Sequence, residues 1–333
     1  MSFLFYFFVE GFHLKITMLP SILLLFGLAT TALSDGCPPD ESIFPCTCIQ
    51  NDFDVDATVT CLDEKLSLGN LKRILEVFDH QDSLAVELSG LNLGRVPEDF
   101  FQGVNVKRLE LWQCPLESLG ERPLTGLEDS LETLIISASV MDEDVNFKFP
   151  VGHLNNLKLL QLSDNSIPTL GDDWFKDGPK SLEHLILSDN NIGRLGHRAF
   201  AGIESLRILF LAGNRFGHFR RSMLPNPASK LVELELDNNG LTSLPENMFS
   251  NMPALELISL QTNGLNRITK EIFETVWEQL ESLDMRGNSL ECDSHLEWML
   301  HAKSMVRLQG TCQTPPEREG VELKDVITGK AKL

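Results

Sequence analysis

The chain has 333 residues, of which 42% are hydrophobic and 23% charged, a composition typical of globular and not of disordered proteins. Its formal net charge of −20 argues against nucleic acid as a partner, because a binder of phosphate backbones needs a basic surface, and against docking on anionic lipid. The charge favours solubility and a basic or neutral partner.

The first 34 residues are predicted to be a secretory signal. An apolar run from Met18 is followed by small residues, with Ala32 three residues before a cut ahead of Asp35. We interpret residues 1–17 as an extension upstream of this working start. A signal anchor is the alternative, and the shortness of the apolar run disfavours it. Secretion to the extracellular space without membrane insertion is therefore expected.

A repeat dominates the chain after the signal. The template L-x-x-L-x-L-x-x-N-x-L is filled by six consecutive units, and weaker copies precede them. Successive units are 24 to 26 residues apart and start at Val106, Leu131, Leu157, Leu182, Leu206, Leu231, Leu255 and Leu280. This is the leucine-rich repeat. Each L-x-L is a short strand that buries alternate residues, and one repeat cannot bury that face alone, so the repeats must stack.

The predicted fold is therefore an α/β leucine-rich-repeat solenoid, or horseshoe, with a parallel sheet on its concave face and disulfide-bonded caps. We predict an N-terminal cysteine cap at residues 35–80, repeats at 81–290 and a C-terminal cap at 291–333.

Two columns of the repeat have a structural interpretation. The ladder asparagine is expected to bond backbone groups of its own and neighbouring turns. These residues are Asn165, Asn190, Asn214, Asn239, Asn263 and Asn288. In the weak copies Leu91, Cys114 and Ser139 take this place, so Cys114 is interpreted as a small buried residue and not as a reactive thiol. A second apolar column is expected to form a spine on the convex side: Phe101, Leu124, Phe175, Phe200, Leu224, Phe249 and Phe273.

Seven cysteines fit an oxidising compartment. Four precede the repeats, namely Cys37, Cys46, Cys48 and Cys61, and sequence alone leaves three connectivities open among them. Metal binding by this group is the rival interpretation, which an oxidising compartment disfavours.

Both ends resemble the cysteine caps of extracellular leucine-rich-repeat proteins. The resemblance rests on the four early cysteines and on NSLECDSHLEWML followed by GTCQTPPEREGVEL. It implies the pairs Cys37–Cys48 and Cys46–Cys61. In the family's C-terminal cap two further cysteines pair with each other. Here Ser294 replaces one and the other is absent, which implies that Cys292–Cys312 remains.

A narrower resemblance comes from CPPDESIFPCTC, from LKRILEVF and from the imperfect early repeats. These segments resemble arthropod secreted proteins similar to the non-catalytic subunit of a crustacean luciferin 2-monooxygenase. The resemblance implies a companion role without catalysis.

No motif for catalysis emerges from the sequence. It contains no Gly-rich phosphate loop, no G-x-S-x-G elbow and no H-E-x-x-H helix, so we predict that the chain is not an enzyme and needs no cofactor or metal. Asp52, Asp54 and Asp56 resemble the start of a calcium loop, but Ala57 stands where glycine is needed. A solvated acidic loop is the preferred interpretation.

The outward strand positions on the concave face indicate a binding site. We expect an apolar centre, with Trp112 toward one edge and carboxylates on both sides. The predicted site consists of Trp112, Ile135, Leu159, Ile186, Ile208, Phe210, Glu110 and Glu235. A contiguous apolar patch with a polar rim usually marks an interaction surface. The alternative is that the segment 141–150 covers it.

One group of cations stands out in this acidic chain: Arg194, His197, Arg198, Arg215, His218, Arg220 and Arg221. A site for a sulfated glycan or an acidic protein patch is one interpretation. A solubilising flank is the preferred one.

The sequence thus predicts a secreted protein-binding module, with the non-catalytic partner of a secreted enzyme as one role. A cell-adhesion, guidance or extracellular-matrix protein and an innate immune recognition protein are the alternatives.

Overall fold

The structure is a computed structural model that describes residues 36–52, 54–118, 122, 124–140, 149–176, 178–300 and 306–330. The predicted signal at 1–34 and most of the segment 141–150 lie outside the described residues. Residues 35–333 form one compact unit.

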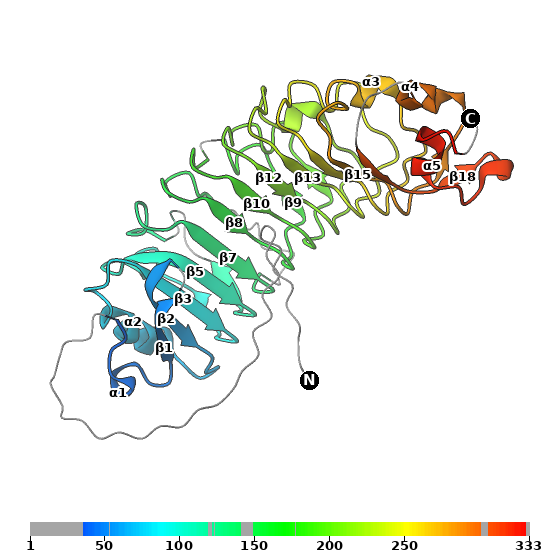
Figure 1. Ribbon diagram of the computed structural model, residues 1–333. Helices are drawn as coiled ribbons and strands as arrows, with labels where there is room; N and C mark the ends of the chain where they lie inside the picture. Colours follow the sequence, from blue (N-terminus) through cyan, green and yellow to red (C-terminus); the bar gives the residue numbers. More distant parts are fainter. Residues whose placement is uncertain are drawn as a thin grey trace. The chain divides into compact units, whose positions relative to one another are not determined.

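One twelve-stranded sheet runs through the described part of this unit, and its strands follow one another in chain order. Figure 1 shows successive strands side by side. The first pair is antiparallel and every later pair is parallel. The strands are β1 (Thr47–Asp52), β2 (Val55–Cys61), β3 (Leu84–Ser89), β5 (Val106–Trp112), β7 (Thr133–Ser137), β8 (Leu159–Gln161), β10 (His184–Ile186), β12 (Ile208–Phe210), β13 (Glu233–Glu235), β14 (Leu257–Ser259), β15 (Ser282–Asp284) and β17 (Arg307–Gln309).

Short elements form the return path of each turn. Three two-stranded pairs join β4 (Gly94–Arg95) to β6 (Leu116–Ser118), β9 (Thr169–Leu170) to β11 (Arg194–Leu195), and β16 (Leu290–Glu291) to β18 (Cys312–Thr314). The helices are α1 (Asp40–Ile43), α2 (Leu68–Glu76), α3 (Lys270–Phe273), α4 (Glu297–Leu300) and α5 (Leu323–Ile327), with 3-10 turns η1 (Arg221–Met223), η2 (Ser294–Leu296) and η3 (Pro316–Arg318). The predicted leucine-rich-repeat solenoid is confirmed.

A single core runs along the inside of the turns. The central leucine of each repeat strand, such as Leu160, Leu185 or Leu209, is fully buried. The predicted spine is buried as well, and its rings touch across turns. Ring centroids lie 6.3 Å apart for Phe175 and Phe200, and 5.2 Å apart for Phe249 and Phe273. Stacked repeats therefore share one core, as a solenoid requires.

The asparagine ladder makes the bonds expected of it. The Asn214 side-chain amide donates to the carbonyl oxygens of Leu187 (3.0 Å) and Leu211 (2.9 Å), which belong to neighbouring turns. Its Oδ1 accepts from the backbone N–H groups of Asn190 (3.2 Å) and Ile192 (2.9 Å). Such bonds satisfy backbone groups that leave the sheet inside the core.

Cys114 takes the ladder position in an early turn and is fully buried. Its Sγ lies 3.4 Å from the Leu88 carbonyl oxygen, and its backbone N–H donates to Ser139 Oγ at 3.0 Å. Burial raises the pKa of the thiol, which opposes thiolate chemistry. The interpretation of Cys114 as a structural residue is confirmed.

Disulfides tie down both ends of the sheet. The pairs are Cys37–Cys48, Cys46–Cys61 and Cys292–Cys312, the pairing that the resemblance to capped proteins implies. At the start, β1 pairs antiparallel with β2 and covers the edge of the parallel sheet. At the other end, the Leu323 backbone N–H of α5 bonds Gly310 O, directly after β17. Capped edges prevent the open strands from pairing with other chains.

Candidate functional site on the open sheet face

The open sheet face is the side of the twelve-stranded sheet that points away from the core. Side chains alternate across a strand, so the residues on both sides of each central leucine reach this face. Parallel register aligns them into two columns across the turns. One contains Leu159, His184, Ile208, Glu233 and Leu257, and the other contains Gln161, Ile186, Phe210, Glu235 and Ser259.

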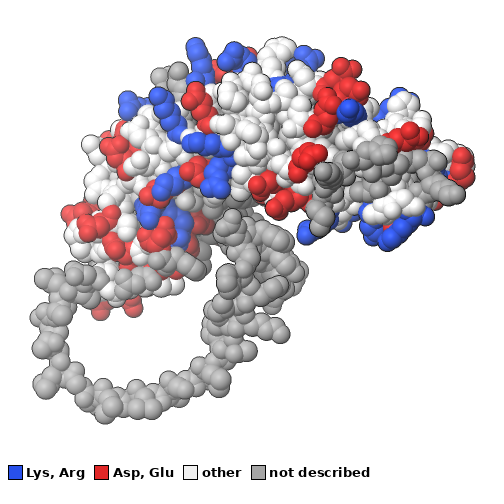
Figure 2. Space-filling model, turned by 45° about the horizontal axis from the view of Figure 1, so that its top comes forward, with Lys and Arg blue, Asp and Glu red and all other residues white. Residues whose placement is uncertain are grey.

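The middle of this face is apolar. Leu159, Ile186, Ile208 and Phe210 are each half-buried, with part of the side chain open to solvent. Ile186 lies directly opposite Phe210 in register, and adjacent strands are only about 4.8 Å apart. The structure thus brings together four of the predicted site residues in one contiguous patch. Figure 2 shows one face of the molecule, on which uncharged areas lie between groups of acidic and basic side chains.

Ile135 departs from its predicted place in this patch, because its side chain is only 6% exposed. It lies in register between Glu110 and Gln161, whose longer side chains flank it. The Ile135 side chain is therefore buried within the protein, and little of its surface can contact a partner.

A charge network occupies the N-terminal side of the face. Arg108 on β5 lies 3.1 Å from Asp52, 3.7 Å from Glu87 and 3.4 Å from Glu110, measured between guanidinium nitrogens and carboxylate oxygens. The indole N–H of Trp112 donates to Glu110 at 3.0 Å. Desolvation raises the pKa of Glu110, while the Trp112 hydrogen bond opposes the rise. Glu110 and Trp112 are thus held by neighbours within the chain.

The acidic loop of the cap belongs to the same network. Asp54 pairs with Lys107 at 2.9 Å, and the hydrogen bond from Lys107 lowers the pKa of Asp54. Asp56 accepts from the Ser83 backbone N–H at 2.9 Å. The loop is therefore tied to β5 and β3, whereas the sequence suggested only a solvated loop. The sequence analysis missed Arg108, which lies two residues before Glu110 on the same strand.

The C-terminal side of the face is acidic, and only some of its carboxyl groups have a partner within the described residues. Asp284 is 6% exposed and forms an ion pair with Arg286. Asp237 accepts from Ser259 Oγ at 2.9 Å and from the Gln261 backbone N–H at 2.7 Å. Within the described residues, the side-chain carboxyl groups of Glu233 and Glu235 have no hydrogen bond or ion pair.

The isolation of Glu235 changes its protonation. Burial, and then the nearby carboxylates of Asp237, Glu233 and Asp189, raise the pKa of Glu235 to about 7. Burial also raises the pKa of Glu233. These two carboxyl groups stand beside Ile208 and Phe210, because β12 and β13 are paired in register. The apolar patch therefore ends at two carboxyl groups that lack a cation.

Arg221 departs from the predicted solubilising flank, because it is 7% exposed. Its guanidinium donates to the carbonyl oxygens of Ser250 (2.6 Å) and Pro225 (2.7 Å) and to the Asn226 side chain (3.2 Å). The side chain thus anchors a wide loop to the next turn.

The fold is that of a leucine-rich-repeat solenoid with disulfide-bonded ends. The family model for the leucine rich repeat matches residues 155–216 and 229–294. No helix in the part of the chain that the structure describes is long and apolar enough to span a membrane.

Known relatives share the repeats over part of their length. The chain is 29% identical over 192 residues to Toll-like receptor 2 type-2 of Gallus gallus, which covers 57% of this chain and 23% of that protein. It is 31% identical over 160 residues to osteomodulin of Bos taurus, covering 41% of this chain and 36% of the relative. The chain thus spans well under half the length of these curated relatives.

Solved structures show the same fold. A chain from a complex of Latrophilin 3, Unc5D and the leucine-rich-repeat protein FLRT2 matches with a TM-score of 0.64 and 23% identity, covering 74% of this chain and 75% of that one. A complex of TLR13 with single-stranded RNA matches with a TM-score of 0.57 and 22% identity, covering 69% and 35%.

Proposed function

We propose that the chain is an extracellular protein-binding module that captures its partner on the open sheet face. The observation that carries the proposal is the apolar patch of Leu159, Ile186, Ile208 and Phe210, which is partly open to solvent and bordered by the carboxyl groups of Glu233 and Glu235. An exposed apolar patch with a polar rim is typical of an interaction surface.

The rim specifies the chemistry of the partner. Among the described residues, Glu233 and Glu235 lie next to the patch and form no ion pair. A lysine or arginine of the partner could therefore form an ion pair with them. Glu110 on the other side is already occupied by Arg108 and Trp112. The expected partner therefore presents an apolar protrusion with a basic group toward β13.

The extracellular location rests on the disulfides, which are typical of oxidising compartments. The similarity of the fold to a chain from a complex of Latrophilin 3, Unc5D and FLRT2 supports protein binding as the role. As the specific role, we favour a non-catalytic companion of a secreted enzyme, because the N-terminal cap resembles arthropod secreted proteins similar to such a subunit. Adhesion and immune recognition are the alternative roles. Each role predicts a different assembly, so a measurement of native mass distinguishes them.

The partner is identified from the native mass of the protein in its own secretory fluid, by size exclusion with light scattering and mass spectrometry. A peak that contains a second, enzymatic polypeptide supports the companion role. A peak with this chain alone at twice its mass indicates homophilic adhesion. Recovery of a microbial product indicates immune recognition.

The site is then tested with Ile186→Glu and Phe210→Glu. Each places a charge in the patch, and we expect the affinity for the identified partner to fall at least about 30-fold while secretion is unchanged. Phe44→Glu and Ile49→Glu are matched controls, since these apolar side chains are 76% and 60% exposed in the N-terminal cap. If the control variants lost binding and the patch variants kept it, the open sheet face would not be the site.

A further inference from the structure

The chain reverses its charge over one short segment. Residues 190–222 contain six arginines, no lysine, no aspartate and a single glutamate, whereas the whole chain has 28 basic and 48 acidic residues. The basic flank consists of the exposed side chains of this segment on the return path of two turns: Arg194, His197, Arg198, Arg215, His218 and Arg220. Basic side chains are therefore concentrated on one surface of an otherwise acidic chain.

These cations are not neutralised by the chain. Among the described residues, none of them has a carboxylate within ion-pair distance, whereas Arg207 and Arg267 pair with Glu183 (3.7 Å) and Glu291 (3.0 Å). Among the described residues, the Arg215 side chain donates only to the Asn191 carbonyl oxygen, at 3.1 Å. The flank thus presents free positive charge and free N–H donors to solvent.

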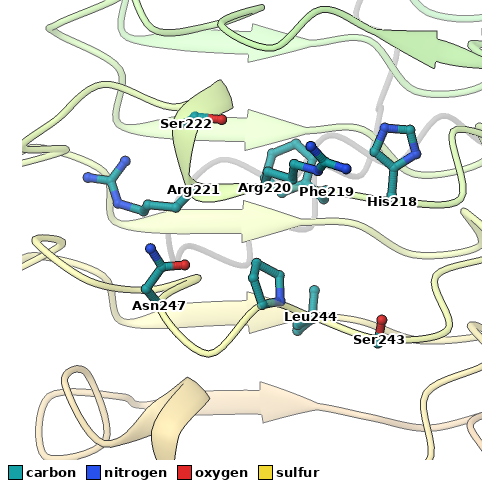
Figure 3. A pocket seen from close by; sticks show the side chains of 9 residues that line it. His218, Phe219, Arg220, Arg221, Ser222, Ser243, Leu244 and Asn247 are labelled. Carbon is teal, nitrogen blue, oxygen red and sulfur yellow. The ribbon is translucent and has the colours of Figure 1, made fainter.

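An open groove of about 450 Å³ lies beside the flank, between two successive turns. His218 and Ser243 line one end, and Arg221 and Asn247 line the other (Figure 3). None of its nine lining residues is acidic. Arg221 adds a fixed charge, because it is buried and bonded to neutral oxygen acceptors. The charged residues that line the groove are therefore all basic.

We propose that the basic flank and its groove bind a sulfated polysaccharide. Arginine presents a planar fork of N–H donors that matches an oxyanion with two parallel hydrogen bonds, which lysine cannot do. Arg194 and His218 occupy corresponding positions in adjacent turns, which lie about 5 Å apart, and Arg215 bonds Asn191 of the earlier turn, so basic side chains of the two turns are neighbours. The hydroxyl and amide groups of Ser222, Ser243 and Asn247 provide hydrogen-bond partners for sugar hydroxyls.

The rest of the molecule restricts this ligand to one place. Outside the flank the chain is strongly acidic, and like charges repel a polyanion from the open sheet face. The sulfated ligand and the protein partner therefore occupy different surfaces.

The test uses the full secreted chain and heparin oligosaccharides as the probe, titrated by calorimetry at about 0.15 M salt. We expect binding of heparin, none of chemically desulfated heparin, and a loss of roughly tenfold or more in the variant with Arg194→Gln, Arg215→Gln and Arg220→Gln. Binding by the variant should also depend less steeply on salt. The single variant Arg220→Gln should show a smaller loss with thermal unfolding unchanged, which separates lost contacts from misfolding.

The matched control replaces two cations that are already paired, Arg207→Gln and Arg267→Gln, and should bind heparin almost as the natural chain does. Equal losses in control and flank variants would overturn the proposal, since net charge alone would then explain binding. No heparin binding at this salt concentration would overturn it too. So would tighter binding of a single-stranded RNA or of a polyglutamate peptide than of heparin, because the flank would then select a different polyanion.

Discussion

The Asn214 side chain forms hydrogen bonds with backbone groups of two successive turns. For Asn214→Ala we expect a loss of about 2–4 kcal/mol in the free energy of unfolding, because two carbonyl oxygens and two N–H groups lose their partner in a site that water does not reach. Urea denaturation followed by circular dichroism measures the loss.

Asn247→Ala is the control for the asparagine substitution, since Asn247 is exposed and should change stability by no more than about 0.5 kcal/mol. A similar small change for Asn214→Ala would mean that the ladder bonds are replaced by water and do not hold the turns together.

Single residues also show where sequence reasoning succeeds and fails. The ladder asparagines and Cys114 were predictable because the repeat period alone places them. Ile135 and Arg221 were not, because their surroundings come from other turns. Arg221 bonds the carbonyl oxygen of Ser250, 29 residues away. Arg108 is a stronger example, since Asp52 lies 56 residues away on a cap hairpin that no repeat pattern predicts.

At the scale of elements, the caps determine how the solenoid ends. The sheet order and the parallel register follow from the repeats, so they were predictable. The antiparallel β1–β2 hairpin and the α5 contact at Gly310 are specific to the ends and have no period to reveal them. The resemblance to capped proteins implied the disulfides, although it did not imply these local backbone contacts.

The C-terminal disulfide is expected to act locally. Replacing Cys292 and Cys312 with serine opens a loop that spans 20 residues and should cost about 3 kcal/mol. Because each turn contacts only its neighbours, hydrogen exchange should accelerate in β17 and β18 and stay slow in β10, β12 and β13. Mass spectrometry of deuterated peptides measures this difference.

Cys114→Ser serves as the control for the cap variant, because it removes a buried sulfur that forms no disulfide. Ser139 already fills the same ladder place in the next turn, where its hydroxyl donates to the Ser137 carbonyl oxygen at 2.8 Å. A serine should therefore fit, at a cost of about 1 kcal/mol or less. Exchange that accelerated along the whole sheet in the cap variant would contradict nearest-neighbour coupling.

At the scale of the whole molecule, the surfaces differ in which charged side chains form ion pairs. The N-terminal side of the sheet face neutralises its carboxylates with Arg108 and Lys107, and the flank keeps unpaired arginines. Glu233 and Glu235 are left without a cation in a chain whose net charge is −20. The sequence placed these residues on one face correctly. It could not show which carboxylates are paired, because pairing depends on side-chain geometry across several turns.

The unpaired carboxyl groups should make stability depend on pH. With a pKa of about 7, Glu235 holds its proton in the folded chain where the unfolded chain, near the ordinary value of 4.5, has already lost it. Stability therefore falls as the pH rises from about 4.5 to 7, and the cost persists above pH 7. Glu235→Gln removes it, so we expect the variant to be more stable at pH 8 by on the order of 1–2 kcal/mol, after allowing for solvent at this half-buried group.

At pH 4 the stability advantage of Glu235→Gln should vanish, because the natural side chain is then protonated in both states. Urea denaturation at several pH values measures the two curves, with the exposed Glu204→Gln as the control. Parallel curves for Glu235→Gln and the natural chain would mean that solvent or a cation already compensates the carboxylate. If the curves converge at low pH as expected, the folded chain maintains a destabilised anion at neutral pH, and a basic partner that neutralises it recovers that free energy on binding.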